Sequence, residues 1–113
     1  MTIELILERV KSVIPVIQIK NIEDALPTAQ ALSEGGLDVL EVTLRTPCAL
    51  NAIQLIKQEI PEICVGAGTV VTPEQLQLVK DAGAEFAVSP GLNANLVLVA
   101  KQIGLPYLPG VMT

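Results

Sequence analysis

Residues 32–46, LSEGGLDVLEVTLRT, decide the fold, because they contain a helix end, a turn and a buried strand in immediate succession. The first three residues close a helical pattern. Gly35 or Gly36 then stands where a helix ends in a left-handed residue. Val39–Leu44 follows as a short, mainly aliphatic run, as expected of a strand buried in a parallel sheet. The segment therefore predicts a helix that leads through a short turn into a parallel strand.

The same unit recurs along the chain. In VKDAGAEF (residues 79–86) and AKQIGLPY (residues 100–107), Gly83 and Gly104 again separate a helical pattern from a strand. Asn21, Thr72 and Asn93 are good N-caps for three of the helices. Strands alternating with helices through short turns predict right-handed βαβ units. The expected strands are Val13–Ile19, Val39–Leu44, Ile63–Ala67, Phe86–Val88 and Tyr107–Leu108, and the expected helices are Ile3–Lys11, Ile22–Glu34, Ala49–Glu59, Pro73–Ala82 and Ala94–Ile103.

Four strand–helix pairs and a fifth strand fit two architectures. An open, flavodoxin-like sheet needs about five parallel strands. A (β/α)8 barrel needs eight, so that the chain would be the first half of one. Periodicity alone leaves both architectures open.

Composition limits the possible partners. The chain has 113 residues, of which 50% are hydrophobic, and a net charge of −5. This length predicts one folded domain over residues 1–113. An acidic chain whose cations are scattered is not expected to bind nucleic acid or a membrane surface. It also lacks a run of about 18 uncharged apolar residues that could span a membrane.

The rarer residue types narrow the chemistry. The sequence has no histidine, which excludes serine–histidine triads and histidine-liganded metals. Cys48 and Cys64 form neither a CxxC pair nor a disulfide framework, a usage that suits a reducing cytoplasm. We interpret both thiols as small buried hydrophobes rather than nucleophiles.

Polar residues follow the expected strands at their carboxyl ends, which form the functional rim in both architectures. Strand alternation places Leu40, Val42 and Leu44 on the face that packs on helices, and turns Glu41 inward. Burial among aliphatic side chains raises the pKa of a carboxyl that has no partner. Glu41 is therefore a candidate general acid and base. The alternative is a structural ion pair with Arg45.

Three other rim segments are candidates. Arg45 carries a planar fork suited to a carboxylate or phosphate, unless it is a solvated loop cation. Gly66-Ala67-Gly68 would let a ligand approach the backbone beside the Thr69 hydroxyl, although the segment is not a dinucleotide fingerprint. Ser89-Pro90-Gly91, taken alone, is a turn signal.

Taken together, five segments resemble the N-terminal half of the 2-keto-3-deoxy-6-phosphogluconate (KDPG) and 4-hydroxy-2-oxoglutarate aldolase family. The resemblance implies a (β/α)8 barrel and a class I, Schiff-base aldolase that cleaves KDPG to pyruvate and glyceraldehyde 3-phosphate. Many members also cleave 4-hydroxy-2-oxoglutarate to pyruvate and glyoxylate. It further implies a cytoplasmic homotrimer that needs no metal or other cofactor. The segments are IPVI (14–17), GLDVLEVTLRT (36–46), VGAGTV (65–70), AVSPG (87–91) and PGV (109–111).

The resemblance also implies roles for individual residues. Glu41 matches the acid and base of carbinolamine formation and C–C cleavage. Arg45 matches the cation that holds the pyruvyl carboxylate, Thr69 a hydroxyl beside that group, and Pro90 a wall of the same pocket. The imine-forming lysine and the phosphate-binding loops of the family lie beyond Thr113. We therefore expect the 113 residues to be a fragment of the aldolase and to be inactive alone.

Three further interpretations stay open. Lys20, at the end of the first expected strand, would replace the missing lysine if a low-dielectric pocket favoured its neutral form. A solvated lysine or a cation near the substrate phosphate is the simpler interpretation. The chain would otherwise be a non-catalytic half-barrel that binds small carboxylates or only self-associates through its open strand edges. The third interpretation is a complete open-sheet regulatory domain.

Overall fold

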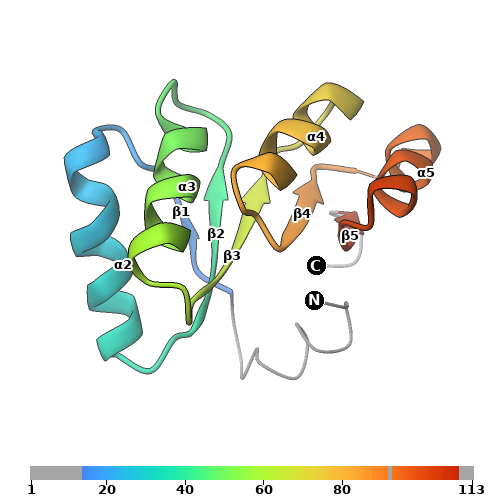
Figure 1. Ribbon diagram of the computed structural model, residues 1–113. Coiled ribbons are helices and arrows are strands. Elements are labelled where there is room, and N and C mark those ends of the chain that lie inside the picture. Colours follow the sequence, from blue (N-terminus) through green and yellow to red (C-terminus); the bar gives the residue numbers. More distant parts are fainter. Residues whose placement is uncertain (1–13, 92, 110–113) are drawn as a thin grey trace.

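A computed structural model describes residues 14–91 and 93–109 of the chain, so the helix expected at Ile3–Lys11 lies outside the described residues. Strands and helices alternate along this part (Figure 1). No helix in it has the length and apolar character needed to cross a bilayer. The elements are β1 (Val16–Ile17), a 3-10 turn η1 (Ile22–Asp24), α2 (Ala25–Glu34), β2 (Val39–Thr43), α3 (Ala49–Glu59), β3 (Cys64–Gly68), α4 (Pro73–Asp81), β4 (Phe86–Ser89), α5 (Ala94–Ile103) and β5 (Tyr107–Pro109).

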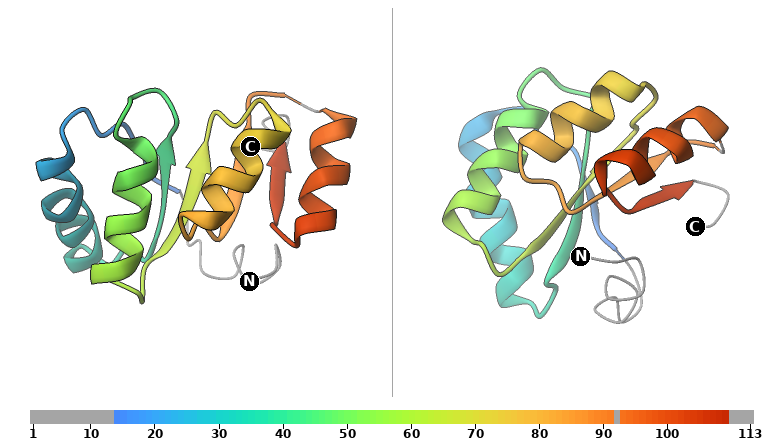
Figure 2. Two further views of the ribbon diagram at one scale, coloured as in Figure 1. Left: turned by 45° about the horizontal axis from the view of Figure 1, so that its top comes forward. Right: turned by 45° about the vertical axis from the view of Figure 1, so that its right-hand side comes forward.

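The order of the strands distinguishes between the two expected architectures. All neighbouring strands are parallel, and they pair in the order β1-β2-β3-β4-β5. Right-handed crossovers between successive neighbours place the helices that connect them on one face of the sheet. Figure 2 shows α2 to α5 side by side on that one face. A doubly wound sheet reverses its strand order and has helices on both faces. The structure is therefore the wall of a barrel, with four βα units and a fifth strand, as predicted.

The two faces of the sheet bury different sets of side chains. Leu40 and Val42 pack against the helices, and Leu44 packs at the margin of the same core, as the alternation predicts. The opposite face is the barrel interior, and it holds a smaller cluster. That cluster comprises Val39, Cys64, Phe86 and Leu108, with Ile14 and Val88 packed beside it. Strand alternation thus separates a helix-facing core from an interior face.

Most helix ends follow their sequence signals. Thr72 opens α4 with a capping box: its Oγ1 accepts from the Gln75 N–H at 3.1 Å, and Gln75 Oε1 accepts from the Thr72 N–H at 3.2 Å. The Asn93 side chain caps α5 by accepting from the Leu96 N–H at 3.1 Å. Gly36, Gly83 and Gly104 have φ values of 92°, 105° and 74°, as expected of left-handed residues after helices.

Asn21 is an exception, because it makes no side-chain capping bond. The expected helix over Ile22–Glu34 begins instead as the short turn η1, and regular α-helix starts at Ala25. Pro27 explains the difference. It has no N–H to donate to the Glu23 carbonyl, and its ring is tolerated only in the first turn of an α-helix.

Strand β1 is shorter than the expected Val13–Ile19: Val13 lies outside the described residues, and within residues 14–19 only Val16 and Ile17 pair with β2. Side chains from the loop after β2 satisfy the Ile19 carbonyl oxygen instead. Thr46 Oγ1 donates to the Ile19 oxygen at 2.5 Å, and Cys48 Sγ donates to the same oxygen at 3.1 Å. The Cys48 thiol is therefore a half-buried hydrogen-bond donor, whereas Cys64 is fully buried as predicted.

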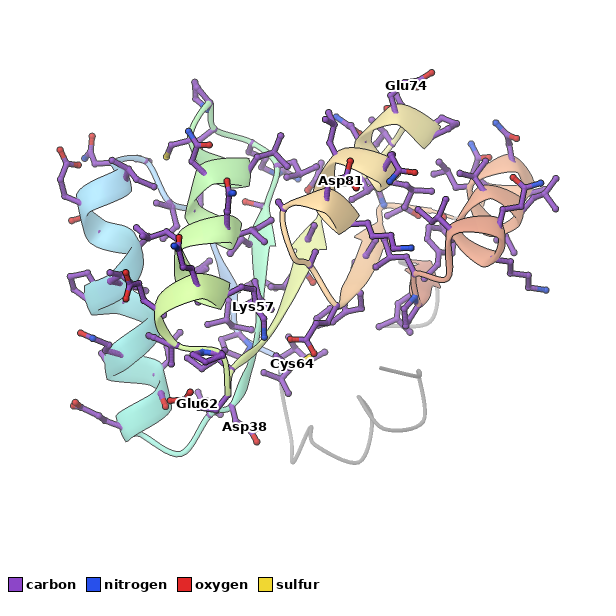
Figure 3. The ribbon with its side chains drawn as sticks, viewed as in Figure 1. Asp38, Lys57, Glu62, Cys64, Glu74 and Asp81 are labelled. Carbon is purple, nitrogen blue, oxygen red and sulfur yellow. The ribbon has the colours of Figure 1, made fainter. Side chains whose placement is uncertain are left out.

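Lys57 holds the amino-terminal end of the sheet together. Its Nζ donates to the carbonyl oxygens of Pro61 at 3.0 Å and Ile63 at 2.7 Å, and it forms an ion pair with Glu85. Figure 3 shows Lys57 toward this end of the strands, with Glu74 at the opposite end of the molecule. The contacts join α3 to the entries of β3 and β4. In a barrel this end serves stability, while the other end serves function.

The capping box gives a first prediction. Thr72→Ala is expected to lower the free energy of unfolding by about 1 kcal/mol, because the Gln75 N–H loses its acceptor. Urea unfolding monitored by circular dichroism measures the change. Thr72→Ser keeps the hydroxyl and is the matched control. Equal stabilities of the alanine and serine variants would contradict the proposed contribution of the cap.

Candidate active site

Glu41 lies in the middle of β2 on the interior face of the sheet. Its register partners are Val16 on β1 and Gly66 on β3, and the same row continues to Phe86 on β4. The Glu41 N–H donates to the Pro15 oxygen at 3.0 Å, which fixes the backbone at this position. The side chain is half-buried. β2 thus presents one carboxyl to an otherwise apolar row, as the alternation predicts.

The carboxyl group of Glu41 lies against Gly68. A Cβ atom built on Gly68 would stand 2.7 Å from Cδ of Glu41 and closer still to its Oε2. A Cβ on Gly66 would stand 2.5 Å from Cδ2 of Phe86. Both distances are shorter than van der Waals contact allows. The space above these two glycines is therefore filled by Glu41 and Phe86, whereas the sequence suggested that it would admit a ligand.

Burial raises the pKa of the Glu41 carboxyl above its ordinary value. The alternative ion pair with Arg45 does not form: Arg45 is exposed, and within residues 14–91 and 93–109 no cation pairs with Glu41. A carboxyl that keeps its proton to higher pH can act as both donor and acceptor closer to neutrality. The site therefore has the physical properties of a general acid and base.

Thr69 follows β3 in a left-handed conformation, with φ at 60°. This conformation is unfavourable for a β-branched residue, and surrounding structure must hold it in place. One hydrogen bond on each side of Thr69 does so. The Leu44 N–H donates to the Gly68 oxygen at 2.9 Å, and the Val70 N–H donates to the Val88 oxygen at 3.0 Å. Thr69 is thereby fixed at the rim, directly after the glycine on which Glu41 rests.

Arg45 and Pro90 lie on the loops after β2 and β4. The carboxyl ends of these parallel strands share one edge of the sheet, so both residues belong to the same rim as Thr69. Arg45 and Pro90 are both exposed. Pro90 lines a cavity of about 220 Å³ together with Val70, Val71 and Asn93. The rim loops therefore leave both residues accessible to a ligand.

A buried hydrogen-bond network that the sequence analysis missed supports the Pro90 turn. Ser89 Oγ donates to the Gly91 oxygen at 2.5 Å and lies 2.5 Å from the Tyr107 hydroxyl. The Tyr107 hydroxyl also reaches the Gly91 oxygen at 3.4 Å. Ser89 and Tyr107 are 18 residues apart, and only the pairing of β4 with β5 brings them together. No local sequence pattern indicates such a contact.

Lys20 does not occupy the low-dielectric pocket that an alternative imine-forming lysine needs. It is exposed, and it lines an open cavity of about 450 Å³ with polar neighbours that include Gln18, Asn21 and Asp24.

The described part of the chain contains no cluster of three or more cysteine or carboxylate side chains able to hold a metal ion.

The raised pKa of Glu41 gives a second prediction. Below the ordinary value of 4.5 the carboxyl is protonated in both the folded and the unfolded state. As pH rises through the folded-state pKa, the folded protein must ionise a half-buried group, so stability is lost. Glu41→Gln removes this ionisation.

The stability difference between Glu41→Gln and the parent protein is therefore expected to grow in favour of the glutamine variant from acid to neutral pH. Urea unfolding at a series of pH values measures it. A difference that stays constant with pH would contradict the burial of an ionisable carboxyl.

Comparison with known proteins agrees with the geometry. The protein-family model described as KDPG and KHG aldolase matches residues 3–113. The KHG/KDPG aldolase of Escherichia coli K12 is 54% identical over 101 residues, which are 89% of this chain and 47% of that protein. The chain thus spans about half the length of the curated relatives it matches.

Solved structures show the same coverage. The crystal structure of 2-keto-3-deoxy-6-phosphogluconate aldolase from Zymomonas mobilis ATCC 29191 superposes with a TM-score of 0.90 at 50% identity, over 96% of this chain and 52% of that one. KDPG aldolase from Legionella pneumophila, captured with pyruvate as a covalent carbinolamine, gives a TM-score of 0.82 at 51% identity, over 85% and 47% of the two chains. Half-barrel topology, the interior glutamate and these similarities agree, and the chain belongs to the KDPG and KHG aldolase family.

Proposed function

We propose that this chain forms one wall of the active site of a Schiff-base aldolase that cleaves KDPG to pyruvate and glyceraldehyde 3-phosphate, with 4-hydroxy-2-oxoglutarate as a second substrate. The observation that carries the proposal is the half-buried, unpaired Glu41 carboxyl resting on Gly68 at the barrel rim. Family membership supports the reaction class, since the Legionella relative holds pyruvate as a carbinolamine.

The reaction requires a group that moves protons in both directions. A lysine amine adds to the C2 carbonyl and passes one of its protons to the oxygen, and a second proton, from an acid, lets that oxygen leave as water to give the protonated imine. Cleavage then removes the proton from the C4 hydroxyl, breaks the C3–C4 bond and moves the electron pair into the imine. In the proposal Glu41 protonates the departing C2 oxygen and accepts the C4 hydroxyl proton. In the proposal the imine-forming lysine lies on the sixth strand of the complete barrel, beyond Thr113.

The remaining rim residues hold the keto acid. The planar fork of Arg45 suits the pyruvyl carboxylate, because it can donate two parallel hydrogen bonds. The Thr69 hydroxyl donates beside it, and Pro90 supplies an apolar wall. Arg45 and Pro90 are exposed, so a ligand can reach them without a rearrangement of the core. Fixing the carboxylate in this way would align the C2 carbonyl with the amine and the acid.

We also propose that residues 1–113 are the N-terminal half of a single (β/α)8 domain, in a cytoplasmic homotrimer. Val16 supports a larger assembly: it shares the interior row with Glu41, yet it is 61% exposed. An apolar side chain on the inner face of a barrel is covered once the barrel closes. The same exposure would suit the second candidate, a non-catalytic half-barrel that self-associates.

Borohydride trapping separates the two candidates and gives a third prediction. The protein as its gene encodes it is incubated with pyruvate and sodium borohydride, and its mass is measured. A gain of one 1-carboxyethyl group is expected, on a lysine other than Lys20. Lys20→Arg is the control, because it keeps the charge and cannot form an imine. No gain in mass would reject the Schiff-base function and favour the non-catalytic candidate, whereas a label lost in Lys20→Arg would assign the imine to Lys20.

A fourth prediction concerns Glu41 itself. Glu41→Gln is expected to lower kcat for KDPG cleavage by about 100-fold or more, because the amide cannot transfer the protons. A coupled assay for pyruvate measures the rate. Glu59→Gln, at an exposed position at the end of α3, is the matched control and should leave kcat unchanged. An unaltered rate in Glu41→Gln would reduce Glu41 to a structural residue.

A further inference from the structure

We propose that Gly68 is a positioning residue for Glu41. Because Gly68 has no side chain, the Glu41 carboxyl can lie directly above its Cα atom. A larger residue at position 68 would move that carboxyl away from the reacting atoms. The catalytic part of this inference rests on the proposed function. The geometric part does not, because it concerns only where the carboxyl lies.

The backbone of Gly68 does not itself require glycine. Gly36, Gly83 and Gly104 have left-handed φ values that side chains rarely adopt, and Gly68 is not among these residues. Gly68 pairs with Thr43 as an ordinary residue at the end of β3. What sets it apart is the space above its Cα atom. That space holds Oε2, Cδ and Cγ of Glu41, with Cγ 3.1 Å from the position that a Cβ would take.

Phe86 explains why Glu41 leans toward Gly68. The direct register partner of Glu41 on β3 is Gly66. The ring of Phe86, which is fully buried, already occupies the space above Gly66. The next inward-facing position of β3 toward the rim is Gly68, and it is also free of a side chain. The Phe86 ring therefore fills the space above Gly66. The space above Gly68, two residues nearer to the rim, is left for the Glu41 carboxyl.

An alanine at position 68 would displace the carboxyl without rebuilding the sheet, because the crowded atoms are the far end of a flexible side chain. The open direction is toward β1, where Val16 is 61% exposed. Few charged groups of the described residues oppose or assist this movement. β1 contributes Val16 and Ile17, the titratable side chain of β3 on this face is the fully buried Cys64, and Arg45 on the following loop is exposed. Hydration is thus the main change, and it lowers the pKa of Glu41 toward its ordinary value.

Carboxyl carbon NMR tests the geometric part directly and supplies the fifth prediction. The titration of Glu41, assigned with Glu41→Gln, is followed in the gene-encoded protein, in Gly68→Ala and in Gly35→Ala. Gly35 is the matched control: its φ is −79°, and a Cβ there would make ordinary contacts of 3.5 Å at the end of α2. The Glu41 midpoint is expected to fall in Gly68→Ala and to stay unchanged in Gly35→Ala. An unchanged midpoint in folded Gly68→Ala overturns the inference.

Kinetics test the catalytic part. A displacement of about 1 Å can cost a reaction about 100-fold, so kcat of Gly68→Ala is expected to fall by that order. The acid limb of its pH–rate profile should move with the NMR midpoint, which a general loss of stability would not produce. A full rate in Gly68→Ala overturns the catalytic role. If the parent protein cleaves no KDPG while the midpoint still falls, the proposed function fails and the positioning of the carboxyl stands.

A double variant covers the case in which Gly68→Ala does not fold. Glu41→Ala removes the atoms that the new methyl group would meet. The double variant Glu41→Ala with Gly68→Ala is therefore expected to regain the thermal stability of Glu41→Ala alone. A double variant that also fails to fold would mean that position 68 needs glycine for its backbone, and this result overturns the inference.

Discussion

The parallel pairing of β2 with β3 is the constraint on which the site depends. Five residue pairs, from Val39 with Cys64 to Thr43 with Gly68, fix the register. A slip of one residue would turn Glu41 into the helix-facing core and Leu40 into the interior. Such a slip would bury a carboxyl among apolar side chains and expose a leucine, and both changes are costly. The hydrophobic segregation that stabilises the wall therefore also determines which face carries the acid.

The two ends of this wall have different physical demands. At the amino-terminal end, the Lys57 ammonium donates to the carbonyl oxygens of Pro61 and Ile63 and pairs with Glu85. These charged groups therefore make structural contacts. At the carboxyl-terminal end, Arg45 and Pro90 stay exposed, and Thr69 adopts an unfavourable conformation. The rim can support this strain because hydrogen bonds from Leu44 to Gly68 and from Val70 to Val88 hold the backbone on each side of Thr69.

Sequence patterns predict the features that depend on local chemistry, and they miss those that depend on register. The alternation of helices and strands, the Thr72 cap and the left-handed glycines follow from neighbouring residues. Asn21 was wrongly expected to cap a helix, because Pro27 moves the start of the regular helix. The roles of Gly66 and Gly68 could not be predicted, since they depend on which residue of β2 and β4 lies opposite each glycine. The contact of Ser89 with Tyr107 has the same cause.

The separation of Glu41 from Arg45 is a requirement of the proposed chemistry rather than an incidental feature. A carboxylate paired with a guanidinium is held in its ionised form and cannot donate a proton near neutral pH. A guanidinium paired with that carboxylate would in turn be less able to bind a substrate anion. The strand holds Glu41 on the interior face, against Gly68, while Arg45 lies beyond the strand end and is exposed. The two residues are close in sequence, and in the proposed reaction the end of β2 between them would let Glu41 hold a proton while Arg45 holds the substrate anion.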